Sequence, residues 1–330
     1  MPQETRHQLP WPQSLWDANW AAVEPDPLPD VRGWLWEEFD PWWTWDISSA
    51  PVDDLLTERL AAEPVQLVRG ANRHRARHWD GTPYQDVTGE RSTRVLDRNR
   101  GTRHSLPLPR RWPDNRRRFV RRFGDPLAHY HGSDSQWFGL DQSQGLWFEA
   151  SAIGEHPLGW LPWIERWQMG HLRTLDVTLP PEHGRNLRAA TVADVPMAPL
   201  LPRPDLDEVR HAQHFVWAAN TSADSSQEGR RNEYGAEFQW PARGSDGEIA
   251  GHPIKPGTWL RLRADYQPPP DVTPHDMRRV RGLQRHGAPI TDATSASAGH
   301  ALRNPMAPRS QIRFDLDFAL TDFEVVRVTP

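Results

Sequence analysis

Three carboxylates, Asp141, Glu149 and Asp176, fall in segments that the sequence predicts to be neighbouring strands. Asp141 and Glu149 bracket an expected hairpin, with QWFGLD before a turn around residues 143–145 and LWFEASAI after it. Asp176 belongs to the next predicted strand, HLRTLDVTL. Glycoside hydrolysis needs two carboxyl groups facing one groove, a protonated acid and an ionised base or nucleophile. The pattern predicts Glu149 as acid/base with Asp176 or Asp141 as the second carboxylate. The alternative is that Glu149 is a solvent-side strand residue or pairs with an arginine.

Tryptophans accompany these acids, and they supply the second element of a sugar site: Trp137, Trp147, Trp160, Trp163 and Trp167. Indole rings stack on sugar rings, and by excluding water they raise the pKa of a nearby carboxylic acid. We therefore expect Trp137, Trp147 and Trp163 to contact a polysaccharide or oligosaccharide. This hypothesis requires that the acids gather in a trench walled by indole rings.

Histidines offer a base or a metal ligand. His211 could assist as a general base, since an imidazole titrates near neutral pH. His129 and His131 share one face of a strand if they lie in one, and with His211 and His214 they are the metal candidates. Because the chain has 15 histidines, chance pairs are common. We expect isolated surface or core histidines and no metal site.

No motif for nucleotide or cofactor chemistry is present: the chain has no Gly-rich phosphate loop, no GxSxG elbow and no HExxH. We therefore expect no cofactor. Residues 110–122 carry a run of arginines interleaved with aromatic side chains, which is typical of a phosphate-tracking surface. The net charge of −5 favours a solvated face paired with acids instead, so nucleic acid is not an expected partner. An acidic polysaccharide would fit this run as well.

Composition limits the elements that can position these residues. The 330 residues include 33 Pro and 18 Trp, and no Cys, which excludes disulfides, thiolate metal sites and cysteine nucleophiles. Proline breaks helices and interior strands, so long regular elements should be few. No run approaches the roughly 18 apolar residues of a membrane helix, so we expect no membrane span.

The sequence predicts a mainly β fold, with a sandwich or jelly-roll-like core and a short C-terminal helix. Residues 258–266, TWLRLRADY, alternate as a half-buried strand, with Arg261 and Arg263 on the polar face. A helix should follow, with Thr273 as N-cap and Gly287 as the C′ residue. A short amphipathic helix is expected over residues 52–62, and FEVVRV is the last strand.

Two parts are expected along the chain, a Trp/Pro-rich N-terminal arm over residues 1–46 and a single β-rich domain over residues 47–330. The arm should pack its tryptophans onto the domain. The alternative is a flexible tail that carries an aromatic binding patch.

An ordered set of landmarks resembles a family of mostly secreted bacterial proteins of unassigned function. WDISSAPV at residues 45–52 resembles the family's WNTDISSAPV, and residues 134–141 followed by LWFE at 146–149 resemble DRHVLVVD followed by LYE. Residues 193–199 resemble ADAAGLPILPG, and DEV at 207–209 with His211 resembles DEV followed by HALRFT. WPAR at 240–243 matches directly, residues 260–295 resemble RLKASFDI and YGMILADNGS, and DFEVV at 322–326 resembles SDFEVV.

The resemblance implies a compact β-rich fold and an extracytoplasmic location, and it supplies no reaction. Asp134-Ser135-Gln136 stands where the family has DRH, so a histidine is lost, and the family cysteine before LYE is absent. The N-terminus lacks the pattern of a signal peptide, which leaves a cytoplasmic location as the alternative. Arg243, in the WPAR landmark, joins the expected substrate-binding residues.

These observations predict a carbohydrate-active protein, namely a glycoside hydrolase or lyase that uses carboxylate acid/base chemistry. Whether the chain is an enzyme at all is left open. One alternative is a non-catalytic glycan-binding or envelope and assembly protein, in which tryptophans serve as stacking platforms or as a contact between copies in a homo-oligomer. Another is a polyanion binder that uses the 110–122 arginines.

Overall fold

The computed structural model describes residues 35–69, 84–108, 137–151, 153–155, 161–183, 195–200, 207–217, 238–243, 252–293, 300–302 and 316–330. Strands dominate this part of the chain, so the fold is mainly β, as the sequence predicts. Two α-helices, α2 (Asp54–Ala61) and α5 (Pro274–Arg285), accompany them. Short 3-10 helices are η2 (Glu37–Phe39), η3 (Trp42–Thr44), η4 (Ala198–Leu200) and η7 (Leu320–Asp322).

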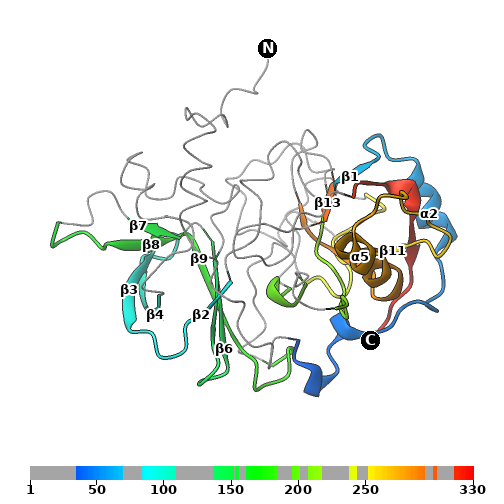
Figure 1. The fold of residues 1–330 in the computed structure, drawn as a ribbon. Coiled ribbons are helices and arrows are strands. Elements are labelled where there is room, and N and C mark those ends of the chain that lie inside the picture. The colour runs from blue at the N-terminus through cyan, green and yellow to red at the C-terminus, as the bar shows by residue number, and fades with distance from the viewer. Residues whose placement is uncertain are drawn as a thin grey trace, which may run out of the picture.

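The largest sheet has seven strands and is mixed. Its order is β14 (Phe318–Ala319), β1 (Leu67–Arg69), β13 (His300–Leu302), β10 (Phe215–Trp217), β12 (Ala288–Ala293), β11 (Trp259–Leu262) and β15 (Phe323–Val326). The pairs β1–β13 and β10–β12 are parallel, and the others are antiparallel. Figure 1 shows this part of the molecule on the right, with α5 and α2 beside β11 and β1.

Two four-stranded sheets form the other part of the molecule, on the left in Figure 1. One has the order β2 (Tyr84–Asp86), β5 (Trp137–Asp141), β6 (Leu146–Ser151) and β9 (His171–Asp176). The other has the order β4 (Thr102–Pro107), β3 (Ser92–Asp97), β8 (Trp167–Met169) and β7 (Gly154–Glu155). The predicted β5–β6 hairpin is confirmed, with Gly145 at φ 63° in its turn.

Three clusters of buried apolar side chains pack these sheets together. One contains residues of both four-stranded sheets, such as Trp137 on β5 and Val95 on β3. A second belongs to the seven-stranded sheet and its helices and includes Leu60 of α2 and Leu283 of α5. The third, which we call the junction cluster, joins residues of β5, β6 and β9 to residues of β11 and β15. The sheet that contains β5 and β6 is therefore packed on both faces.

Both predicted helices are present, with the expected caps. In α5, Thr273 Oγ1 accepts a hydrogen bond from the Asp276 N–H (3.1 Å) and Gly287, at φ 64°, follows the C-cap as the C′ residue. In α2, the Asp53 side chain accepts from the Leu56 N–H (3.1 Å). Leu55 of α2 is 64% exposed, whereas Leu60 is buried.

The described end of the N-terminal arm, residues 35–46, packs its tryptophans into the junction cluster. Trp36 and Trp43 are 1% and 0% exposed, and Trp42 is 6% exposed. The Trp43 indole N–H donates to the Leu35 carbonyl (2.8 Å), and the Trp36 indole N–H to the Leu179 carbonyl (3.1 Å). Packing is thus observed for this part of the arm, while Trp11, Trp16, Trp20 and Trp34 lie outside the described residues.

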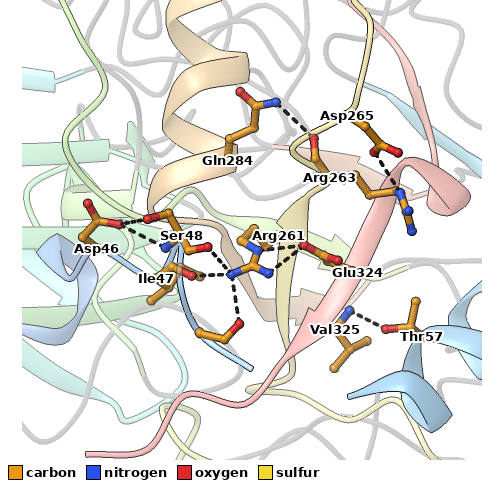
Figure 2. Close-up of polar contacts among 11 residues, drawn as sticks. Asp46, Ile47, Ser48, Thr57, Arg261, Arg263, Asp265, Gln284, Glu324 and Val325 are labelled. Atoms are coloured by element: carbon orange, nitrogen blue, oxygen red, sulfur yellow. Dashed lines mark hydrogen bonds and ion pairs between the residues drawn. The ribbon is translucent and has the colours of Figure 1, made fainter. Parts of the chain in front are cut away.

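Residues 45–52 are fastened to β11 and β15 through Arg261, as Figure 2 shows. The Arg261 guanidinium pairs with Glu324 (2.8 Å), and its Nη1 donates to the carbonyls of Ile47 (2.6 Å), Ser48 (2.8 Å) and Ala50 (3.1 Å). The sequence places Arg261 on the polar face of this strand. Residues 47–50 cover that position, and Arg261 is 8% exposed. Arg263, two residues on, pairs with the exposed Asp265 (3.1 Å) as a solvent-facing residue.

Candidate functional site

The structure places Asp141 and Asp176 in one row of the sheet, with Leu146 between them. Leu146 pairs with Asp141 on one side and with Asp176 on the other, so the three residues share a face. Two strand spacings separate the two acids, which is about 10 Å between their Cα atoms. They are 3% and 9% exposed.

Both of these carboxylates accept hydrogen bonds from the turns that follow them. Asp141 Oδ1 accepts from the backbone N–H and the hydroxyl of Ser143 (3.0 and 2.6 Å), and its Oδ2 accepts from Gln144 Nε2 (2.7 Å). Asp176 Oδ1 accepts from the N–H and the hydroxyl of Thr178 (3.0 and 2.5 Å). Such local bonds are typical of turn-forming aspartates, and they occupy both carboxylate oxygens of Asp141 and one of Asp176.

Glu149 lies on the opposite face of the same sheet. It is three residues from Leu146 on β6, and side chains alternate between faces along a strand. Its cross-strand neighbours are Phe138 and Arg173. The side chain is 0% exposed, and its Oε1 accepts a hydrogen bond from the Met197 N–H (3.0 Å). The expected cross-strand proximity of Glu149 to Asp141 is therefore wrong, because the hairpin register puts them on different faces, and Glu149 is not a solvent-side residue.

The 195–200 segment contacts both Glu149 and His214. Its Met197 N–H reaches Glu149, while the Leu200 carbonyl accepts from the His214 N–H (3.1 Å). His214 Nδ1 lies 2.8 Å from Thr291 Oγ1, and its Nε2 lies 3.9 Å from Asp292 Oδ2. Sequence reasoning did not identify residues 195–200 as the link between His214 and Glu149.

His211 is poorly suited to the predicted general-base role. It is 1% exposed, and its Nδ1 donates to the Ala212 carbonyl (2.8 Å). Burial lowers the pKa of His211 to about 3. An efficient general base has a pKa near the working pH, so an imidazole this weak would accept a proton only in acid.

Two of the predicted sugar-stacking tryptophans are core residues. Trp137 and Trp147 are both 0% exposed, the first between the four-stranded sheets and the second in the junction cluster. Their expected place in an exposed wall is wrong, because both faces of the β5–β6 hairpin are covered. Trp167 is 4% exposed as well, and Trp160 lies outside the described residues.

Trp163 is the exception, since its side chain is 77% exposed. It lies at the third position of a turn in which the Ile164 N–H donates to the Leu161 carbonyl (3.1 Å). Pro162 occupies the second position, where its fixed φ favours a β-turn. Two residues further, Glu165 Oε1 accepts from Arg94 Nη2 (2.6 Å) and Arg103 Nε (2.7 Å). We call Trp163, Glu165, Arg94 and Arg103 the Trp163 patch.

Arg243 is half-buried at the end of the turn that contains Trp240. Trp240 stacks on Trp45 with ring centroids 5.4 Å apart and planes at 28°. The WPAR landmark therefore meets the WDISSAPV landmark, and Phe238, 38% exposed, precedes them. Arg243 makes no ion pair with another of the residues that the structure describes.

The described ranges hold neither a metal-ligating cluster nor a membrane-spanning helix. Within them, no group of three or more His, Cys, Asp or Glu side chains could hold a metal ion. None of the helices described is both long and apolar enough to cross a bilayer. The candidates His129 and His131 and the 110–122 arginine run lie outside the described residues.

The residues proposed for chemistry are thus separated into a buried group and an exposed patch. Comparison of the chain with protein-family models, with curated proteins and with solved structures gave no match.

Proposed function

We propose that this protein binds a glycan through Trp163 and does not cleave it. The observation that carries the proposal is the 77% exposure of Trp163 in a turn, two residues before the glutamate that pairs with Arg94 and Arg103. A large aromatic face left in water at a rigid turn costs solvation free energy, which stacking on a sugar ring would recover. A stacking platform needs such a face and no reactive group.

The positions of the carboxylates favour binding over hydrolysis. Glu149 is buried in the core. Asp141 and Asp176 lie on the opposite face of the sheet and accept hydrogen bonds from the turns that follow them. A retaining or an inverting glycosidase needs two carboxyl groups about 5 to 9.5 Å apart on either side of one substrate bond. No pair among these three acids faces a shared, solvent-accessible space with an indole beside it.

Affinity electrophoresis through gels that contain neutral or acidic polysaccharides tests the proposal. We expect the full chain to be retarded by at least one polysaccharide, and the Trp163→Ala variant to migrate as in an empty gel. Leu55→Ala is the matched control, because Leu55 is also strongly exposed (64%) but lies on α2 in the other part of the molecule. Equal retardation of Trp163→Ala and the full chain, or no retardation in any gel, would overturn the proposal.

Release of reducing ends from the retained polysaccharide separates binding from catalysis. The proposal predicts that the full chain and Glu149→Gln release none above the blank. Cleavage by the full chain that disappears in Glu149→Gln would establish the enzyme hypothesis instead.

We also propose that the two four-stranded sheets form a β-sandwich, supported by the apolar cluster that they share. The parallel pairs in the seven-stranded sheet do not support a jelly roll there, since jelly rolls are antiparallel. Membership of the family with the WDISSAPV and WPAR landmarks, and an extracytoplasmic location with it, are proposals too. The family proposal is supported by the contact of Trp45 with Trp240 and of residues 47–50 with Arg261, which bring its landmarks together.

A further inference from the structure

We infer that the glycan bound at the Trp163 patch is acidic, with carboxylate groups on its sugar rings. This inference rests on the proposed function, because it names the class of ligand for the same residues. The two arginines of the patch carry it.

Strand register puts both arginines on the outer face of their sheet. Val95, between Arg94 and Leu96 on β3, is 0% exposed and belongs to the inner cluster, so Arg94 points the other way. Arg103 on β4 pairs with Leu96, and paired residues share a face. The side chains of Arg94 and Arg103 are 66% and 55% exposed.

Glu165 holds the two guanidinium groups together. Its Oε1 accepts from Arg94 Nε (3.1 Å), Arg94 Nη2 (2.6 Å) and Arg103 Nε (2.7 Å). The hydrogen bonds from Arg103 and Arg94 hold the pKa of Glu165 below its usual range, so the carboxylate is ionised at neutral pH. Two positive charges against one negative charge leave the group with one net positive charge.

Donor groups remain available for a ligand. Arg94 Nη1 and both Nη groups of Arg103 make no hydrogen bond to the residues that the structure describes, and both side chains face solvent. A guanidinium binds a carboxylate through two parallel N–H donors, which a neutral hydroxyl does not match. The fixed position of Glu165 reduces the conformational entropy that these arginines would otherwise lose on binding.

Trp163 precedes by two residues the glutamate that holds both arginines. Trp163 and Glu165 are two residues apart, so their Cα atoms lie at most about 7 Å from each other. A sugar ring stacked on the indole would therefore place a ring carboxylate near the guanidinium groups that Glu165 holds. A uronic acid offers both a sugar ring that can stack on the indole and a carboxylate that can pair with an arginine.

Nucleic acid is the competing anionic polymer, and the charges favour the glycan. A duplex carries about one negative charge per 1.7 Å of its axis, and binding neutralises many phosphates at once. The Trp163 patch has one net positive charge, on a chain whose net charge is −5. A uronate polymer presents about one charge for each sugar ring, which fits a single indole and its pair of arginines.

Calorimetric titration with polygalacturonate and with its methyl-esterified form tests the inference, because the two polymers differ only in the charge of the carboxyl group. We expect the full chain to bind the acidic polymer more tightly than the ester, and more weakly in high salt. Arg94→Ala and Arg103→Ala should each weaken binding of the acid about five-fold. Arg263→Ala, which removes another exposed arginine with an acidic partner, is the matched control and should bind as the full chain does.

Each other outcome points to a definite error. If acid and ester bind equally and only Trp163→Ala loses them, the acidic ligand class is wrong and the proposed function stands. If no glycan binds any form of the protein, the proposed function fails. If a single-stranded RNA homopolymer binds more tightly than polygalacturonate, and the arginine variants lose it, the ligand is nucleic acid and the inference is overturned.

Discussion

Arg261 and Arg263 show how position decides what an arginine contributes. Both lie in the RLR sequence that an alternating pattern assigns to a polar strand face. The Arg261 side chain is 9% exposed and reaches one carboxylate and three backbone carbonyls, whereas the Arg263 side chain is 44% exposed and pairs with an exposed aspartate. Breaking a buried pair leaves an uncompensated charge, whereas an exposed pair is screened by water.

Replacing these arginines in turn should separate the two contributions to stability. We expect Arg261→Ala to lower the free energy of unfolding by about 3 kcal/mol, because Glu324 and three carbonyls lose their donor. Arg263→Ala should change it by less than about 1 kcal/mol. Urea unfolding followed by tryptophan fluorescence measures both. Equal effects of the two variants would mean that Arg261 does not fasten residues 47–50 to the sheet.

The carboxylates show which part of a site can be read from a sequence. The β5–β6 hairpin and the strand that carries Asp176 were predictable, because alternation and turn residues mark them. The face of the sheet on which Glu149 lies was not predictable, because it depends on the register that pairs Asp141 with Leu146. The burial of Trp137 and Trp147 does have a signal in the sequence, because WFGL and LWF are continuous apolar runs, which are typical of strands buried on both faces.

At the scale of elements, residues 35–47 act as a packing segment between the seven-stranded sheet and the sheet that contains β6. Trp42 contacts Trp259 of β11 with ring centroids 5.6 Å apart, and Trp36 stacks on Trp147 of β6 at 6.3 Å. Trp43 lies between them, 5.1 Å from Trp42 and 5.6 Å from Trp36. Edge-to-face and stacked arrangements at these distances add to the apolar surface that each ring buries.

Removal of the middle ring should therefore affect the whole molecule. We expect Trp43→Ala to lower the free energy of unfolding by about 3 to 5 kcal/mol, the cost of emptying a large buried site. Trp163→Ala is the matched control and should change stability by less than about 0.5 kcal/mol, because its ring is in solvent. Thermal or urea unfolding measures the pair. A small effect of Trp43→Ala would show that the arm does not contribute to the core.

Element boundaries were predictable where a local chemical signal marks them. Thr273, Asp276 and Gly287 define the ends of α5 through side-chain caps and a left-handed C′ residue, and the observed helix follows them. Gly287 also lies close to the 45–52 segment, since an added Cβ would come within 2.7 Å of Ile47 Cδ1. That long-range contact, unlike the caps, has no signature in the local sequence.

At the scale of the whole molecule, three clusters connect every sheet that the structure describes. The junction cluster contains residues from the arm, from three strands of a four-stranded sheet and from β11 and β15. Residues 35–46 thus share a core with later segments. The boundary between an arm ending at residue 46 and a domain starting at residue 47 stays a prediction.

Buried histidines should make the stability of this molecule depend on pH. Burial lowers the pKa of His211 to about 3 and of His300 to about 4, and it also lowers the pKa of His286. The unfolded chain binds these protons with a pKa of about 6.5, so between that value and the folded pKa it holds more protons than the native state. The contribution of these histidines to the free energy of unfolding is therefore at its full value above about pH 7, and it falls as the pH decreases through 6.5.

We expect a loss of about 1 kcal/mol for each of His211 and His300 from about pH 7.5 to about pH 5.5, and a further loss from His286. Urea midpoints across this range measure the loss, and unfolding at pH 6 in buffers of different ionisation enthalpy should show net proton uptake by the chain. A constant midpoint with no proton uptake would mean that the native state binds protons at these histidines as readily as the unfolded chain does.

The measurement that tests the account most directly is a calorimetric titration of the full chain and Trp163→Ala with one acidic oligosaccharide, since heat reports both binding and turnover. We predict saturable binding by the full chain with no continuing heat after saturation, and a loss of about ten-fold or more in affinity for Trp163→Ala. Equal affinity of the two proteins, or heat that continues at a steady rate after each injection, would contradict it.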